Sequence, residues 1–391
     1  MKRLHAFQFF LARIRYIIYR IALRVAFGSK FGGALGTGIF RDIEESSKNP
    51  ELAKRILKKN LLASARVLTY DFPPDYPSWF CRSEAFSDRF QYQIADVVVS
   101  PFTSAMWIPN VAFLQQSNGS LLRIFNSHRG IIETYYPTTE LNETAPICVA
   151  PNKSEYFHWL LEALPEVLHA KSNFPDCKVL TAMPLNRFKR QSMNFFNIQD
   201  DAIIYAETPI RAQKAILTPR WVNSGFIPQE DVDILRRHIL SKLPATSPKR
   251  RIYISRSKSG NRSTYISRGK SENRSIVNES ELEQLLMSFG FEICFFEEMD
   301  FTDQMRLCNE AEYLIAPHGA GLSNMIAGQP GMHVHELISI TWPNTCYAKL
   351  AAQLEFNYSY TLLKPDDGGQ ITIDIQSMSR HIQSIWPNLV G

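Results

Sequence analysis

Short apolar runs alternate with amphipathic segments throughout the second half of the chain, and this alternation restricts the fold more than any other feature of the sequence. Runs with the residue types of buried strands occupy 251–255, 291–296, 313–316, 334–338 and 358–362. Helical spacing of apolar residues separates them, at 279–289, 301–310, from about 322, and at 347–354. Alternation of this kind is typical of a parallel β-sheet with right-handed helical crossovers. We therefore expect an α/β fold in which ligands bind at the carboxyl ends of the strands.

The first half of the chain has a less regular pattern of the same kind. Expected strands occupy 94–99, 111–113, 121–125, 131–136, 146–150, 178–182, 202–205 and 214–218, and Asn118-Gly119 is a hairpin signal between two of them. Expected helices occupy 43–67, 156–170, 189–196 and 228–243. Pro244–Lys249 has the composition of an interdomain linker. We expect four parts: an arm at 1–40, an N-terminal domain at 41–245, a C-terminal domain at 246–365, and a helix within 366–391 that packs back on the body.

The composition is that of a globular protein. With 391 residues, of which 45% are hydrophobic, the chain has enough apolar material for two cores. The net charge of +5 comes without a dense basic run beyond the N-terminus, so we expect no nucleic-acid partner. The six cysteines are scattered and form no Cys-x-x-Cys pair. This spacing disfavours a zinc site or a disulfide framework and predicts free thiols in a reducing compartment.

Residues 1–28 form a basic, apolar arm. Arginines interrupt the apolar run too often for a bilayer span, and the small residues of a signal-peptide cleavage site are absent. On a helix, Lys2, Arg13, Arg20 and Arg24 share a narrow stripe opposite the apolar residues. This pattern predicts an amphipathic helix on an anionic membrane surface. The alternative is an arm that packs on the protein's own core or on a partner subunit.

The segment Ala316–Asn324 follows an expected strand and opens an expected helix. Gly319 and Gly321 allow close backbone approach and positive φ, and the helix N-terminus presents free N–H groups to an anion. His318 and Asn324 add side-chain donors. The segment therefore predicts a phosphate-binding turn. The alternative is a tight turn with no ligand.

A tandem repeat precedes the helix at 279–289. Tyr253–Thr264 begins Tyr-Ile-Ser-Arg, and 265–275 begins with the same four residues. Arg256 or Arg268 therefore stands at the carboxyl end of a strand, where arginine suits bidentate phosphate contact. The first copy keeps the strand lead-in and the second keeps the connection to Glu279, so the sequence leaves open which copy lines a site. The alternative is a solvated basic loop.

His158 and Glu162 are four residues apart on an expected helix, so they share a face. Such a pair can form a general base with its orienting carboxylate. The alternatives are a core histidine bonded to its neighbour and an acceptor-binding role. Asp231-Val-Asp233 has the form of a metal-binding Asp-x-Asp clamp, but it lies inside an expected amphipathic helix, where a solvated face is the expectation.

Several motifs in a fixed order resemble glycosyltransferase family 61. They are Tyr-Phe-His-Trp-Leu-Leu-Glu-Ala-Leu-Pro at 156–165, Tyr-Ile-Ser-Arg…Asn-Arg-Ser-Ile-Val-Asn-Glu at 265–279, Gly-Phe-Glu…Phe at 290–301, Ala-Pro-His-Gly-Ala-Gly-Leu-Ser-Asn at 316–324, Val-His-Glu at 334–336 and Tyr-Ala-Lys-Leu-Ala at 347–351. The chain looks most like the bacterial capsular-polysaccharide members of the family. The duplicated loop departs from the family's single copy.

The resemblance implies a GT-B fold, in which two Rossmann-like domains face a cleft, with an N-terminal amphipathic helix added here. It implies inverting transfer from a nucleotide sugar, typically a UDP-sugar, with no cofactor and no obligatory metal. The donor-binding residues it implies are Arg256, Arg268, Arg274, His318, Gly319, Ala320, Gly321, Asn324 and, for the ribose, Glu336. On the acceptor side it leaves His158 or Glu162 as the base.

The membrane anchor expected of Golgi members is absent. The resemblance therefore favours a bacterial cytoplasmic enzyme on the inner face of the plasma membrane, acting on a glycan or lipid-linked glycan. Two other functions stay open: a non-catalytic sugar-nucleotide-binding or scaffold protein of a polysaccharide assembly complex, and a phosphate-binding hydrolase. The sequence does not indicate an oligomeric state.

Overall fold

The structure is a computed structural model of the chain. It describes residues 38–39, 50–73, 76–78, 80, 82–102, 106–108, 112–114, 138–150, 155–182, 185–218, 225–256, 276–341, 343–367 and 370–389. Outside the described residues lie the arm at 1–28, the Asn118-Gly119 signal, the expected strands 121–125 and 131–136, and Arg268 and Arg274 of the second repeat copy.

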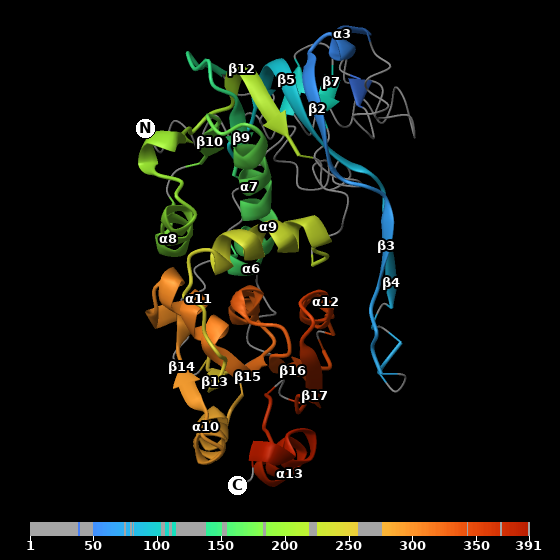
Figure 1. Cartoon of the computed structure of the whole chain (residues 1–391), viewed down its shortest axis with the longest axis vertical. Coiled ribbons are helices and arrows are strands. Elements are labelled where there is room, and N and C mark those ends of the chain that lie inside the picture. The colour runs from blue at the N-terminus through green and yellow to red at the C-terminus, as the bar shows by residue number, and fades with distance from the viewer. Residues whose placement is uncertain are drawn as a thin grey trace.

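The C-terminal half contains a five-stranded parallel sheet (Figure 1). Its strands are β13 (Arg250–Ile254), β14 (Glu292–Cys294), β15 (Ala311–Pro317), β16 (His333–Ser339) and β17 (Asn357–Leu363), in the order β14-β13-β15-β16-β17. The alternation in the sequence therefore predicted this sheet correctly. The order is that of a doubly wound sheet, because the chain leaves β13 toward one side for β14 and returns to the other side for β15. Between the carboxyl ends of β13 and β15 the connecting segments diverge, which leaves space for a ligand.

Alternate residues of these strands face two different cores, as the two-residue period of a strand requires. On one face, Tyr253 packs with α10 (Glu279–Ser288) and α13 (Ile375–Ile385). On the other, Ile252 and Ile254 pack with α11 (Phe301–Glu310), the 3₁₀ helix η6 (Ala320–Ala327) and α12 (Cys346–Gln353). The last helix thus lies beside α10 against the C-terminal sheet (Figure 1). The described residues also include the short 3₁₀ turns η3 (Asp200–Ala202), η5 (Phe296–Glu298) and η7 (Pro387–Leu389).

The N-terminal half contains a ten-stranded mixed sheet in the order β1-β7-β6-β5-β12-β9-β10-β11, with β2 paired to β5 and β8 paired to β12. Its strands are β1 (Gly38–Ile39), β2 (Ile56–Ala63), β5 (Arg89–Val99), β6 (Met106–Ile108), β7 (Ala112–Leu114), β8 (Thr139–Glu140), β9 (Ile147–Val149), β10 (Lys178–Thr181), β11 (Ile203–Tyr205) and β12 (Ile210–Leu217). The strands β12, β9, β10 and β11 are parallel to one another. Strand β5 is antiparallel to each of its neighbours β2, β6 and β12. The fold is therefore mixed α/β.

The expected helix at 43–67 is wrong over the part that the structure describes. Only α3 (Pro50–Ala53) is helical there, and the chain continues as β2 and β3 (Arg66–Thr69). This segment forms a strand and not a helix because it pairs with β5 at the edge of the N-terminal sheet. Ile56 pairs with Ile94, and Leu61 pairs with Phe90. Lys59 also places its Nζ 3.7 Å from the centroid of the Phe90 ring. Helix propensity is weak enough for such contacts to override it.

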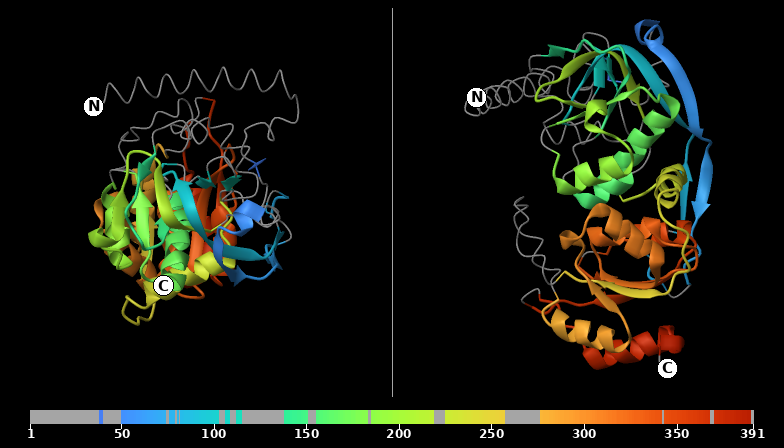
Figure 2. Two further views of the ribbon diagram at one scale, coloured as in Figure 1. Left: turned by 90° about the horizontal axis from the view of Figure 1, so that it is seen from above. Right: turned by 60° about the vertical axis from the view of Figure 1, so that its left-hand side comes forward.

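The hairpin of β3 and β4 (Ser83–Phe86) leaves the N-terminal sheet and runs along the C-terminal half (Figures 1 and 2). Tyr76 and Phe80, near its tip, contact Tyr360 of β17 with ring centroids 4.7 and 5.3 Å apart. Glu84 of β4 forms an ion pair with Lys349 of α12 at 2.6 Å. The hairpin therefore connects the two halves on one side of the molecule.

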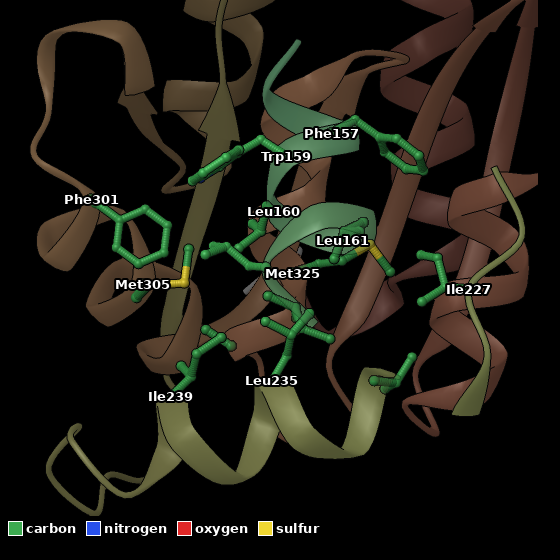
Figure 3. Close-up of a cluster of buried hydrophobic side chains, with 14 of the residues drawn as sticks. Phe157, Trp159, Leu160, Leu161, Ile227, Leu235, Ile239, Phe301, Met305 and Met325 are labelled. Carbon is green, nitrogen blue, oxygen red and sulfur yellow. The ribbon is translucent and has the colours of Figure 1, made fainter. Parts of the chain in front are cut away.

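Helices of the N-terminal half lie between the two sheets (Figure 1). They are α6 (Tyr156–His158), a π-helical turn η2 (Trp159–Ala163), α7 (Leu164–Asn173), α8 (Arg187–Phe195) and α9 (Gln229–Leu240). Figure 3 shows their apolar side chains packed together with residues of the C-terminal half, such as Leu161 and Leu235 with Met305 and Met325. One continuous core therefore joins the two halves.

The Asp-x-Asp segment lies on α9, but the expected solvated face is wrong for its first residue. Asp231 is buried and bonded to Arg89 Nη1 at 2.7 Å and His169 Nε2 at 2.9 Å. Burial works against the charge of Asp231, yet Arg89 and His169 outweigh it and hold the pKa of this carboxyl at about 2. The helical pattern did not predict this network because its partners come from β5 and α7. No described helix is long and apolar enough to cross a membrane.

Candidate active site

A cavity of about 400 Å³ lies at the carboxyl ends of β13 and β15. The C-terminal half supplies Ile254 and Arg256 from β13 and the segment after it, the turn 319–322, and the aromatic residues Phe296 and Phe301. The N-terminal half supplies Tyr156 from α6 and Arg187, Phe188 and Gln191 from α8. The cavity is therefore at the position that the doubly wound sheet predicts, and residues of both halves line it.

Arg256 of the first repeat copy lines this cavity. Strand β13 ends at Ile254, and one carboxylate oxygen of Glu279 then accepts hydrogen bonds from three groups of the copy: the Tyr253 hydroxyl at 2.9 Å, the Ser255 hydroxyl at 3.1 Å and the Arg256 backbone N–H at 2.8 Å. Ser255 also bonds Glu283 at 2.6 Å. In sequence, Glu279 follows the second copy. Its hydrogen bonds therefore connect the start of the first copy to the helix that comes after the second copy.

Gly319 and Gly321 leave little room for a side chain, and neither has an unusual backbone conformation. A Cβ at Gly319 would lie 3.3 Å from Arg256 Nη1, and one at Gly321 would lie 3.1 Å from Ile254 Cγ2. Gly319 has extended backbone with φ of 173°, and neither glycine has a φ in the left-handed region. The expected left-handed φ is therefore wrong, and the close approach of this backbone to an anion stays a prediction. Ala320 also lines the cavity, at the start of η6.

Asn324 is tied to other protein groups. Its side-chain N–H donates to the Gly321 carbonyl at 2.9 Å, and its Oδ1 accepts from the Tyr156 hydroxyl at 2.5 Å. Burial raises the pKa of Tyr156 well above its ordinary value, so the phenol stays a neutral donor. Asn324 lines the cavity, and its side chain fastens the turn to α6 instead of reaching out as a free donor.

His318 and Glu336 form a buried pair behind the turn. His318 Nδ1 contacts Glu336 Oε1, and Glu336 has no exposed surface. The Tyr358 hydroxyl donates to Glu336 Oε2 at 2.6 Å. The expectation of Glu336 as a ribose partner is therefore corrected, because both of its oxygens already have partners inside the protein.

His158 and Glu162 are in contact, as their spacing predicted. His158 Nδ1 lies 3.0 Å from Glu162 Oε2, and Glu162 Oε1 accepts from the Gly225 backbone N–H at 3.2 Å. His158 Nε2 lies 3.2 Å from the exposed carboxylate of Glu155. The His158 ring does not line the cavity, whereas Tyr156, two residues earlier, does.

A chain of aromatic rings connects the two histidine–glutamate pairs. Phe157 packs edge to face on His158 at 5.2 Å and on Tyr347 at 5.6 Å, and Tyr347 packs in the same way on His318 at 5.3 Å. The two pairs come from different halves of the chain. The sequence could not indicate that they share this packing.

Several lining residues were missed in the sequence. Arg187 is on α8 and forms an ion pair with Asp300, just before α11, at 2.7 Å. Gln191 accepts from the Phe301 N–H at 3.2 Å. The sequence signal for Tyr156 was its place in the His158 motif, whereas α8 carries no motif that points to a site. Among the described residues, no group of three His, Cys, Asp or Glu side chains is arranged to hold a metal ion.

A doubly wound parallel sheet with an arginine and a glycine-rich turn at its switch point, closed by a second lobe, is typical of Rossmann-like transferases. The profile of the protein family described as Glycosyltransferase 61 matches residues 156–335, from α6 to β16. Through this stretch the chain belongs to glycosyltransferase family 61, and its substrates are a sugar donor and an acceptor. No curated protein matches the chain.

Proposed function

We propose that this glycosyltransferase transfers a sugar from a nucleotide donor, a UDP-sugar, to a hydroxyl of a glycan or lipid-linked glycan in the synthesis of a surface or capsular polysaccharide. The transfer inverts the anomeric centre. The two sheets correspond to the two lobes of a GT-B enzyme in this proposal, with the donor on the C-terminal lobe.

The cavity between the carboxyl ends of β13 and β15 is the observation that carries this proposal. Its volume of about 400 Å³ falls in the range of small-molecule sites. Phe188, Phe296 and Phe301 give it an apolar part suited to a nucleobase and ribose. Arg256 and the backbone of the turn at Gly319 give it a polar part suited to a diphosphate.

His158 is the proposed base. Its Nδ1 lies 3.0 Å from Glu162 Oε2 and its Nε2 lies 3.2 Å from the exposed carboxylate of Glu155. In this proposal the ring takes the proton of the acceptor hydroxyl. The acceptor oxygen then forms a bond to the anomeric carbon as the bond from that carbon to the diphosphate breaks. The electron pair of the broken bond leaves on the diphosphate oxygen, where Arg256 stabilises the charge.

Neither a cofactor nor a divalent metal takes part in the proposed reaction. Arg256 and the N–H groups of the turn supply the positive potential that a cation supplies in metal-dependent transferases. Activity should therefore persist in the presence of a chelator.

The direct test incubates the full chain with a panel of UDP-sugars and glycan or lipid-linked acceptors and measures UDP release with and without EDTA. We expect acceptor-dependent release that EDTA does not abolish. UDP binding without turnover over the whole panel would favour a scaffold protein. UDP-sugar cleavage at a rate independent of acceptor would favour a hydrolase, and strict dependence on added metal would contradict the proposed mechanism.

We further propose that the enzyme works in the bacterial cytoplasm on the inner face of the plasma membrane, to which residues 1–28 bind through their basic stripe. Co-sedimentation with vesicles containing anionic lipid tests this. Binding that persists after deletion of residues 1–28, or that is equal for neutral vesicles, would contradict it.

A further inference from the structure

Two cysteines of the N-terminal half lie next to each other in its core. Cys148 is on β9 and Cys177 stands just before β10, and their Sγ atoms are 3.8 Å apart. In the parallel register Cys148 pairs with Val179 of β10, so Cys177, two residues earlier, lies on the same face of the sheet. No other two of the described cysteines are within hydrogen-bond distance of each other.

The surroundings of the two thiols differ. The Lys171 Nζ donates to the Cys177 carbonyl at 2.6 Å and to the Pro175 carbonyl at 3.2 Å, which brings a positive charge close to Cys177. The hydrogen bond between the thiols and the charge of Lys171 lower the pKa of Cys177, whereas the same hydrogen bond and burial raise the pKa of Cys148. Cys177 is therefore the more reactive of the two, because the thiolate is the nucleophilic form.

Cys177 is buried, but it ends a turn at the surface. Its backbone N–H donates to the Phe174 carbonyl at 2.9 Å, and Pro175 and Asp176 between them are exposed. This turn follows the last residue of α7. Local opening of the turn therefore exposes the Cys177 thiol without unfolding the sheet.

The two cysteines also bracket an important segment of the chain. Tyr156, His158 and Glu162 all lie between them in sequence. The sulfur atoms of a disulfide are about 2 Å apart, so a small shift of the turn at Cys177 brings the two thiols to bonding distance. A bond between them would close the whole segment into a loop with both ends fixed.

We propose that Cys148 and Cys177 are a redox-responsive pair, which a peroxide oxidises to an intramolecular disulfide and a dithiol reduces again. The Cys177 thiolate attacks one peroxide oxygen, the O–O bond breaks, and water leaves with Cys177 as a sulfenic acid. The Cys148 sulfur then attacks the Cys177 sulfur, the S–O bond breaks, and a second water leaves with the proton of Cys148. Two thiols are oxidised and one peroxide is reduced to two waters.

The test treats the reduced, folded full chain with hydrogen peroxide and then counts thiols and maps peptides by mass spectrometry without reduction. We expect two of the six thiols to be lost, and a linked peptide pair that contains Cys148 and Cys177 and is two hydrogens lighter than the separate peptides. Dithiothreitol should restore both thiols. Hydrogen exchange in peptides within 155–176 should be slower in the oxidised protein, because both ends of the segment are then fixed.

Three variants identify the role of each thiol. Cys148→Ser should form no disulfide and should leave Cys177 as a sulfenic acid that dimedone traps. Cys177→Ser should leave Cys148 reduced. Cys346→Ser makes the same chemical change at a buried cysteine that contacts no other described thiol, and it should form the disulfide as wild type does. The wild-type peptide map carries the test if a variant does not fold.

The proposal is overturned if Cys148 and Cys177 both stay reduced in peroxide that oxidises free glutathione completely in the same time. It is also overturned if the two pair only after the chain has been unfolded in guanidinium, because the thiols would then be packing groups of the core. Unchanged hydrogen exchange within 155–176 in the disulfide form would contradict the restraint of this segment.

Discussion

At the scale of single residues, Arg256 is a cation that the fold holds at the cavity. Its backbone N–H is bonded to Glu279, and its guanidinium lies against Gly319 and the His318 carbonyl. A guanidinium held in this way loses little conformational entropy when it binds a phosphate.

We expect Arg256→Ala to weaken UDP binding about 10- to 100-fold, since a charge-assisted hydrogen bond contributes about 1.5–3 kcal/mol. Arg256→Lys should recover only part of this affinity, because lysine cannot make two parallel bonds. Calorimetric titration with UDP measures both. Arg306→Ala is the matched control, because Arg306 is an exposed arginine paired to Asp303 outside the cavity lining. A loss in the control as large as in Arg256→Ala would contradict the assignment.

His158 can be separated from the donor site by kinetics. A general base contributes roughly 10²- to 10⁴-fold to the rate of a proton transfer. We expect His158→Asn to lower kcat by a factor in that range while the Kd for UDP stays within about twofold, because the ring does not line the cavity. Glu162→Gln should reduce kcat less. A wild-type kcat in His158→Asn would show that the base is another residue.

At the scale of elements, strands and helices of the C-terminal half could be predicted because their own residues decide them. The runs near β13, β15 and β16 are apolar enough for strands buried on both faces. Asn278 stands at the N-cap of α10 as its type suggests, yet its side chain bonds the backbone of Ile373, at 2.8 and 2.9 Å, and the Glu281 side chain at 3.3 Å, and makes no capping bond to the helix backbone. The N-cap position of Asn278 could be predicted from the local sequence, whereas its hydrogen-bond partner Ile373 could not.

The edge strand β2 could not be predicted, because residues distant in sequence decide its structure. Its residues Leu57, Lys58 and Lys59 favour a helix as readily as a strand, and the choice depends on pairing with β5, more than twenty residues away. Two of its leucines, Leu57 and Leu61, stay about half exposed, so burial gives its sequence no clear period. The β3–β4 hairpin is held by contacts with β17 and α12 that are still more distant in sequence.

The contact between β16 and α13 should make the stability of the protein sensitive to acid. His335 is fully buried, with Ser359 and Thr361 hydroxyls 2.8 and 2.9 Å from its two ring nitrogens. Burial, with a smaller effect of His381, lowers the pKa of His335 to about 3, and burial also lowers the pKa of His333 and of His381. The unfolded chain takes up a proton near pH 6.5 and the folded chain does not, so folding stability is lost as the pH falls below 6.5.

His335 alone should cost about 3 kcal/mol between pH 6.5 and pH 4. His335→Gln removes this titration, so its free energy of unfolding should fall less steeply with pH than that of wild type over this range. Urea unfolding at several pH values measures the two slopes. Carboxylates such as Asp231 lower the stability of both proteins in acid, and the comparison cancels their effect. Parallel slopes would contradict a buried neutral His335.

At the scale of the whole molecule, the two halves meet through a packed core and not through an open gap. Leu161, Leu235 and Met325 belong to one cluster, and the β3–β4 hairpin adds a second connection (Figures 1 and 3). The sequence motifs predicted the turn at Gly319 and the His158 helix separately. Their meeting through Tyr156 and Asn324, and the entry of α8 into the cavity, depend on how the halves pack, which no local pattern encodes.

The tandem repeat gives a prediction about the whole chain. Deletion of residues 257–268 leaves Tyr253–Arg256 followed directly by the rest of the second copy, so every residue that bonds Glu279 is retained. We expect the deletion to fold and to bind UDP within about threefold of wild type, as an insertion in a loop changes stability only slightly. Thermal unfolding and calorimetry measure this. Loss of UDP binding in a folded deletion variant would mean that a residue within 257–268 supplies a donor contact.

The location of bound UDP tests the central claim most directly. A crystal structure of the full chain with UDP should show the diphosphate against Arg256 and the turn at Gly319, and the base among Phe188, Phe296 and Phe301. UDP bound anywhere other than at the carboxyl ends of β13 and β15 would contradict the account.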